Sequence, residues 1–269
     1  MRRILALLSL LGLLAGCGLL PDQIDETKGW SASKLFTEAK EKMADADYAR
    51  AIELFEKLEA RYPYGAYAQQ AQLEVAYAYY LDNEPASAIA ACDRFIKLHP
   101  NHPHVDYVYY LKGLANFVEN QDFLSQLSEQ DMSERDPKAA KDAFAAFKEL
   151  STRFPESKYT PDAVARMAYL VNSLASHEVK VANYYFKRGA YVAAVNRSKH
   201  VLENYKTSPF QEGALAIMVK SYERMGMNDL RDDARRVLDK NFPNSPWLTG
   251  DGPKKNKSWW QFWSIDSLN

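Results

Sequence analysis

The sequence has little cysteine, no excess of positive charge and no long apolar segment. Only two of its 269 residues are cysteines, and 34 basic residues stand against 35 acidic ones. This balance argues against nucleic acid as a partner. The apolar run 4–14 is shorter than the ~20 residues that a membrane-spanning helix needs.

Catalytic motifs are also missing. No G-x-S-x-G sequence or phosphate-binding loop is present. Ser31-Ala-Ser-Lys34 matches the S-x-x-K of penicillin-binding enzymes, but neither Ser-Asp-Asn nor Lys-Thr-Gly accompanies it. The match also lies at the start of an ordinary amphipathic helix. We therefore expect no enzyme and keep an envelope enzyme only as the alternative from another functional class.

Three histidines in one turn raise the question of a metal site. His99, His102 and His104 lie between two prospective repeats, and Asp106 is the nearest further metal-ligand type. Two prolines stiffen the same turn. We expect a solvated turn, with no metal and no cofactor.

The N-terminus has the features of a bacterial lipoprotein signal. Arg2 and Arg3 precede the apolar run, and Leu14-Ala-Gly-Cys17 matches a lipobox. We expect residues 1–16 to be removed, Cys17 to carry lipid and residues 17–30 to form a tether. Gly18, where an aspartate would favour the inner membrane, favours an outer-membrane address on the periplasmic face. The alternative is an ordinary signal peptide with a chance cysteine. With Cys17 acylated, Cys92 alone remains and no intramolecular disulfide can form.

One helical pattern returns along the chain. In Tyr48–Pro63, small or apolar residues recur at helical spacing before a proline. The same pattern returns before Pro100, Pro155 and Lys206, and in a shifted register before Pro243. Helix pairs of this period are typical of tetratricopeptide repeats. The repeated positions are Ala51, Ile52, Phe55 and Leu58; Ala88, Ile89, Cys92 and Phe95; Ala143, Phe144, Phe147 and Leu150; and Ala194, Val195, Ser198 and Val201.

The fold class is therefore an all-α solenoid of about five tetratricopeptide-like helix pairs over residues 31–247. An acidic insertion, 119–136, splits the third repeat. It is either a loop on the binding face or a mobile acidic loop. The expected repeats are 33–66, 67–102, 105–157, 160–208 and 211–245.

A groove for a partner or substrate is expected on the first helices of the second and third repeats. First helices line the concave face of such arrays. Aromatic walls suit an extended or helical peptide with aromatic anchors. The alternative is that these rings form the core between repeats. The expected groove residues are Gln70, Leu73, Tyr77, Tyr80, Tyr107, Tyr110, Leu114 and Phe117.

The C-terminal tail, 248–269, differs in composition from the repeats. Lysines beside tryptophans are typical of a membrane-interface anchor. A docking tail for a partner and a segment folded back on the solenoid remain alternatives. The residues concerned are Lys254, Lys255, Lys257, Trp259, Trp260, Phe262 and Trp263.

Four strings carry a resemblance to a known family. They are RYPYGAY (61–67), DRFIKLHPNHPHVDYV (93–108), RDP (135–137) and RGAYVAAVNR (188–197). Together with the lipobox and the split third repeat, they resemble the YfiO/ComL family of outer-membrane lipoproteins. The resemblance covers roughly residues 14–243 and leaves the tail outside.

The resemblance implies a scaffold of the outer-membrane β-barrel assembly machinery. Such a scaffold binds the barrel-forming subunit BamA, contacts the other assembly lipoproteins and receives unfolded outer-membrane proteins. Arg188 and Arg197 lie in the matching RGAYVAAVNR string and are the candidates for the BamA side. The rival within scaffolds is an adaptor lipoprotein for a pilus or secretion system.

Overall fold

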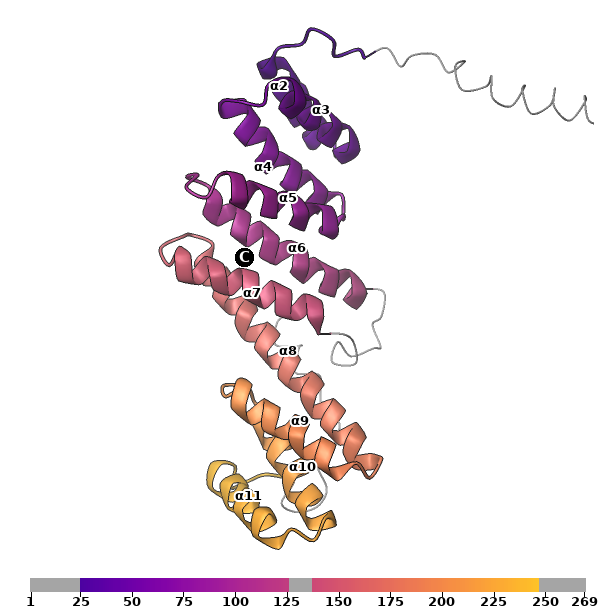
Figure 1. Cartoon of the computed structure of the whole chain (residues 1–269), viewed down its shortest axis with the longest axis vertical. Coiled ribbons are helices and arrows are strands. Elements are labelled where there is room, and N and C mark those ends of the chain that lie inside the picture. Colours follow the sequence, from indigo (N-terminus) through magenta and orange to yellow (C-terminus); the bar gives the residue numbers. More distant parts are fainter. Residues whose placement is uncertain (1–24, 126–136, 247–269) are drawn as a thin grey trace, which may run out of the picture. The chain divides into compact units, whose positions relative to one another are not determined.

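The computed structural model describes residues 25–125 and 137–246, the side chains of 118–125 excepted (Figure 1). All regular structure in these ranges is helical. The chain divides into two compact units, and the boundary falls inside α4, after Ala71. The helices are α2 (Ala32–Ala44), α3 (Tyr48–Arg61), α4 (Ala66–Leu81), α5 (Pro85–Leu98), α6 (Val105–Ser125), α7 (Lys138–Arg153), α8 (Thr160–Lys187), α9 (Tyr191–Asn204), α10 (Gln211–Arg224) and α11 (Asn228–Asn241).

The first unit is built on the hairpin of α2 and α3. Ser31 begins α2 as its N-cap, because its hydroxyl accepts a hydrogen bond from the backbone nitrogen of Lys34 at 3.2 Å. The two helices pack along their length, and a short turn at residues 45–47 joins them. Leu35 and Phe55 are fully buried between them. The apolar spacing of each helix thus fixes which face meets the other.

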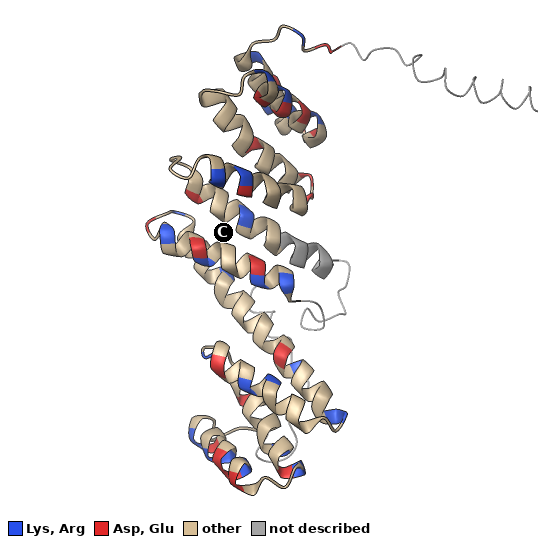
Figure 2. Ribbon diagram, in the orientation of Figure 1, with Lys and Arg blue, Asp and Glu red and all other residues tan. Residues whose placement is uncertain are grey.

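The second unit is a series of helices in which each packs on the next. Contacts join α5 to α6, α6 to α7, α7 to α8, α8 to α9, α9 to α10 and α10 to α11. Packing by sequence neighbours is the defining property of helical repeat proteins. The expected all-α, tetratricopeptide-like fold class is confirmed. Figure 2 shows that basic and acidic residues are interspersed along the helices.

The repeated positions form the core. Ala51, Phe55 and Leu58 in the first copy are fully buried, and the residues at corresponding positions in later copies are buried or half-buried. In the last helix, Ala234 and Leu238 are buried, as the shifted register predicts.

In the split repeat, α6 packs on α7. Gly113 of α6 faces Phe147 of α7 so closely that a Cβ would lie 2.3 Å from the ring. α6 continues to Ser125, so the expected insertion 119–136 begins as helix, and its residues 126–136 lie outside the described ranges. Thr160–Lys187 forms one long helix, α8. Within the described ranges no helix combines the length and apolarity of a transmembrane span.

Candidate binding surfaces

A chain of tyrosine rings crosses the second unit. Tyr77 and Tyr80 come from α4, Tyr107 and Tyr110 from α6, and Tyr159 from the residue before α8. Ring centroids lie 6.5 Å apart for Tyr77–Tyr80, 6.4 Å for Tyr77–Tyr107, 5.3 Å for Tyr107–Tyr159 and 4.9 Å for Tyr110–Tyr159. Each helix supplies two rings three residues apart, which places them on one face. We call these five residues the tyrosine surface.

Polar contacts fix one end of the tyrosine surface. The hydroxyl of Tyr110 donates a hydrogen bond to Oδ2 of Asp162 at 2.7 Å, and Nε of Arg166 donates to the same oxygen at 2.6 Å. Burial, together with the Asp162 hydrogen bond, raises the pKa of Tyr110 to about 12. Burial also raises the pKa of Tyr107. Both phenols therefore stay neutral at physiological pH and offer flat rings with hydroxyl groups.

The exposure of the expected groove residues varies. Leu73, Tyr77, Tyr80, Tyr107, Tyr110 and Leu114 are half-buried in the second unit and pack against its core. Phe117 departs from the expectation, since it is only 7 % exposed and packs on Phe147 and Tyr169. Phe117 is therefore part of the core between repeats, which was the alternative interpretation of the groove residues. Gln70 is exposed and belongs to the first unit.

The two arginine candidates occupy different surroundings. Arg188 is exposed at the end of α8, with its guanidinium 5.8 Å from the ring centre of Tyr184. Arg197 on α9 is exposed, but it is not simply solvated. Its Nη1 lies 3.1 Å from Oε2 of Glu178, which is buried in α8.

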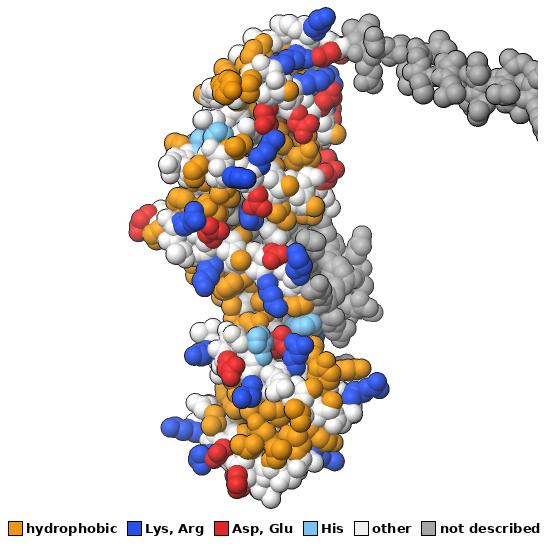
Figure 3. Space-filling model, in the orientation of Figure 1, with side chains coloured by type: hydrophobic (Ala, Val, Ile, Leu, Met, Phe, Trp, Pro, Cys, Tyr) orange, Lys and Arg blue, Asp and Glu red, His pale blue; other side chains and the backbone are white. Residues whose placement is uncertain are grey.

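Exposed apolar side chains mark the C-terminal helices. Figure 3 shows hydrophobic side chains gathered over the lower part of the second unit, where α9, α10 and α11 lie. In or beside α9 and α11, the large exposed hydrophobic residues are Val192, Met227, Leu230 and Val237. An apolar area of this kind is typical of a protein contact surface.

The histidine turn has structural contacts. Nε2 of His99 lies 2.7 Å from Oε1 of Gln72, and the rings of His99 and His102 pack 5.1 and 5.2 Å from that of Phe95. The backbone nitrogen of His104 donates to Nδ1 of His102. In the described ranges no three metal-binding side chains come together.

Sequence reasoning missed Tyr159, Asp162 and Glu178. The i, i+4 spacing of Asp162 and Arg166 indicates an ion pair on one helix, but its contact with Tyr110 joins residues 52 positions apart. Nothing in the sequence marks Glu178 as buried, because an acidic residue on a helix normally faces solvent. Cys17 and the predicted tail residues lie outside the described ranges.

Comparison with known proteins identifies the family. Residues 29–238 match the family model YfiO, described as an outer membrane lipoprotein. The chain belongs to the YfiO family. It is 46% identical over 266 residues to a Neisseria meningitidis serogroup A protein named outer membrane protein assembly factor BamD, a match that covers 98% of this chain and 100% of that protein.

Proteins of the same name from other bacteria are also similar. The one from Xylella fastidiosa strain 9a5c is 39% identical, covering 84% of this chain and 77% of its own length. The one from Vibrio cholerae is 35% identical, covering 86% and 95%. The resemblance drawn from the four sequence strings is therefore confirmed. As a YfiO member, the chain is associated with the outer membrane and is a scaffold, not an enzyme.

Proposed function

We propose that the chain is a lipid-anchored periplasmic scaffold of the β-barrel assembly complex. In this role it binds BamA and the other assembly lipoproteins and receives unfolded outer-membrane proteins for folding and insertion. The observation that carries the proposal is the 46% identity, over nearly the whole chain, to proteins named as outer membrane protein assembly factors. The stack of helix pairs agrees with a protein that binds other chains along its surface.

The tyrosine surface is the proposed site for the aromatic end of a nascent barrel strand. Half-buried rings are held in place by their neighbours, so little side-chain entropy is lost when a further ring stacks on them. Each such aromatic pair contributes about 0.5–1.5 kcal/mol. The neutral hydroxyl groups can also donate hydrogen bonds to a peptide.

The C-terminal part is the proposed BamA side. Arg188 and Arg197 supply positive charge at the end of α8 and on α9, and exposed apolar residues lie on α9 and in or beside α11. Lipid on Cys17 is the proposed anchor. The lysine and tryptophan residues of the tail are proposed as a second contact with the membrane interface.

Photocrosslinking in cells tests the partner assignment. A photoreactive residue at Tyr77 is expected to trap unfolded barrel proteins, and one at Arg188 is expected to trap BamA. Material captured from solubilised envelope should contain BamA as its main partner. Capture of pilus or secretion components in its place would overturn the proposal in favour of an adaptor for those systems.

Peptide binding tests the tyrosine surface. Tyr77→Ala combined with Tyr110→Ala should weaken binding of a barrel protein's C-terminal peptide about tenfold or more, because two ring contacts are lost. Tyr184→Ala, at a 56 % exposed ring outside the tyrosine surface, is the matched control and should leave binding unchanged. Equal affinity for all three proteins would show that the peptide binds elsewhere.

A further inference from the structure

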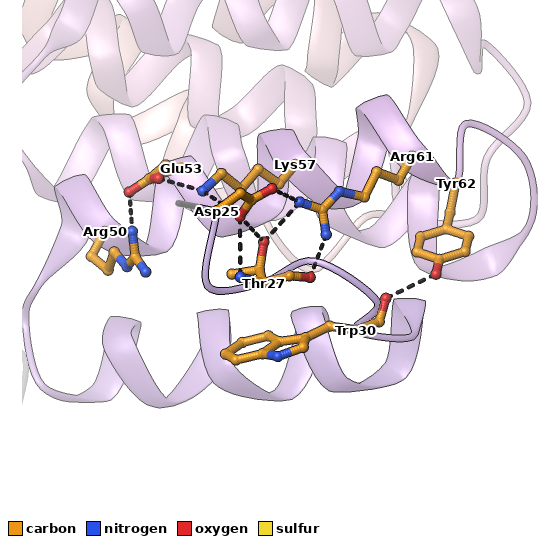
Figure 4. Close-up of polar contacts among 8 residues, drawn as sticks. All are labelled: Asp25, Thr27, Trp30, Arg50, Glu53, Lys57, Arg61 and Tyr62. Atoms are coloured by element: carbon orange, nitrogen blue, oxygen red, sulfur yellow. Dashed lines mark hydrogen bonds and ion pairs between the residues drawn. The ribbon is translucent and has the colours of Figure 1, made fainter. Parts of the chain in front are cut away.

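The segment before α2 is fixed to α3 by a cluster of polar contacts (Figure 4). Arg61 donates to the carbonyl oxygen of Thr27 at 2.6 Å and to its hydroxyl at 2.8 Å, and it forms an ion pair with Asp25. Lys57 lies 3.3 Å from the same carboxylate. Thr27 is fully buried. We call Asp25, Thr27, Lys57 and Arg61 the N-terminal clasp.

The ion pairs and hydrogen bonds of the N-terminal clasp persist over a wide pH range. Hydrogen bonds from Thr27 lower the pKa of Asp25 well below its ordinary value of 3.8, and Lys57 and Arg61 lower it further. A carboxylate with a lowered pKa stabilises the folded form above its ordinary pKa and loses this effect only as the pH falls below it. The clasp is therefore intact at neutral and mildly acidic pH.

The clasp shortens the effective tether. Asp25 lies eight residues after Cys17. A fully extended chain spans at most about 3.3–3.6 Å per residue, so these eight residues reach no more than about 29 Å. A lipid on Cys17 would therefore hold the clasp end of the first unit within that distance of the bilayer.

Exposed aromatic residues lie at the same end. The hydroxyl of Tyr62 donates to the carbonyl oxygen of Trp30 at 2.8 Å, and Nζ of Lys34 lies 4.2 Å from the Trp30 ring centre. Tyr64 is 91 % exposed, and Tyr67 is 42 % exposed. We call Trp30, Lys34, Tyr62, Tyr64 and Tyr67 the aromatic tip.

We propose that the aromatic tip lies in the headgroup layer of the outer membrane's periplasmic leaflet, where the clasp and the lipid on Cys17 hold it. Tryptophan and tyrosine favour this layer because their rings are apolar and their polar groups can stay hydrated. Lys34 beside Trp30 supplies a charge for lipid phosphates. The proposal rests on the lipid anchor of the proposed function and adds a membrane contact besides the lipid and the tail, since firm anchoring commonly needs more than one contact.

Fluorescence quenching tests the position of the tip. The full lipidated chain carrying Tyr64→Cys would be labelled with an environment-sensitive fluorophore and reconstituted into phosphatidylethanolamine/phosphatidylglycerol vesicles that contain brominated lipid. Labelling is selective, because Cys17 is acylated and Cys92 is buried. The matched control is Asp45→Cys, in the turn at the opposite end of the α2–α3 hairpin. α3 has 14 residues and is therefore about 20 Å long. Quenching at position 64 should be several-fold greater than at position 45.

Quenching and flotation together separate the tip contact from the lipid anchor. Weak or equal quenching at the two positions, in a chain that still floats with the vesicles, would overturn the tip contact and leave the lipid anchor standing. A chain that does not float would overturn both. Photocrosslinking from position 64 in cells to a protein and not to lipid would also overturn the proposal.

A second pair of variants tests the clasp. Asp25→Asn combined with Thr27→Val removes the ion pairs and the hydroxyl contact without changing side-chain size greatly. This change should at least halve the quenching at position 64, because the tip is no longer held near the tether. Lys42→Gln removes an ion pair with Asp45 at the far end of the hairpin and should have no effect. Unchanged quenching in the clasp variant would show that the clasp does not position the tip.

Discussion

Arg197 on α9 reaches across to Glu178 on α8, with Nη1 of the arginine 3.1 Å from Oε2 of the glutamate. The glutamate side chain is 5 % exposed and the arginine side chain 46 %. A half-exposed guanidinium thus satisfies a buried carboxylate. An acidic group on a binding partner could attract Arg197 only in competition with Glu178, so partner binding at this point acts on the packing of α8 against α9.

We predict that Arg197→Leu destabilises the fold, because it leaves the buried carboxylate of Glu178 without this partner. The expected loss is about 1–3 kcal/mol in the free energy of unfolding, below the full cost of breaking a buried pair because Arg197 is half-exposed. Urea denaturation followed by circular dichroism measures it.

The double variant separates this effect from partner binding. Glu178→Gln in the Arg197→Leu background should restore most of the lost stability, because a neutral amide costs less to bury than a charge. BamA binding that stays weak in the stabilised double variant would assign Arg197 a direct contact. If Arg197→Leu alone is as stable as the parent, the pair contributes nothing to the fold.

The core could be predicted from the sequence because helical spacing is a local property. Phe55, Cys92 and Phe147 each lie eight positions before a proline, and all three are buried. Gly113 occupies a packing position of α6, against Phe147. The repeat pattern indicates which face of each helix packs against the neighbouring helix.

The contacts of the candidate surfaces could not be predicted in the same way. Phe117 has the spacing of a groove residue, yet Tyr169, 52 positions later, helps to bury it. Asp25 and Arg61 are 36 positions apart, and nothing in the tether's composition marks it as docked. Both contacts depend on which distant segment packs against the residue, and the helical periodicity of one segment does not contain that information.

Gly113 provides a second stability prediction. Gly113→Ala should destabilise the fold by about 1–3 kcal/mol, because the added methyl group would overlap the ring of Phe147. Combining it with Phe147→Leu should cost less than the two single changes added together, since a smaller side chain makes room for the methyl group. Thermal and urea unfolding of the four proteins provide the double-mutant cycle.

Gly213 is the matched control for this prediction. It also lies in a helix, but a Cβ there would be 3.4 Å from Cγ1 of Val179, which is ordinary contact. Gly213→Ala should leave stability unchanged or raise it by up to about 1 kcal/mol, because alanine favours helix. Similar losses at both glycines would contradict the close packing at Gly113.

Ser31 tests whether its S-x-x-K match has any catalytic meaning. Ser31→Ala should lower stability by about 0.5–2 kcal/mol, because the N-cap hydrogen bond to Lys34 is lost. Ser31→Asp should keep most of the stability, since aspartate also caps helices and has no nucleophilic hydroxyl. Barrel assembly in cells that depend on the Ser31→Asp variant should be normal. Loss of assembly despite a stable fold would contradict a purely structural role.

Cys92 should be unreactive in the folded protein. Burial raises the pKa of its thiol to about 12 from an ordinary value of 9.0, so it stays protonated at pH 8. Its contribution to stability is complete below pH 9 and is lost as the pH rises toward 12. Iodoacetamide at pH 8 should modify the thiol at least a hundredfold more slowly in buffer than in urea, as mass spectrometry can follow. Cys92→Ala, which removes the thiol, controls for reaction at other side chains. Rapid modification of the folded chain would show that α5 opens readily from α6 and that the helix pairs are not a continuous packed core.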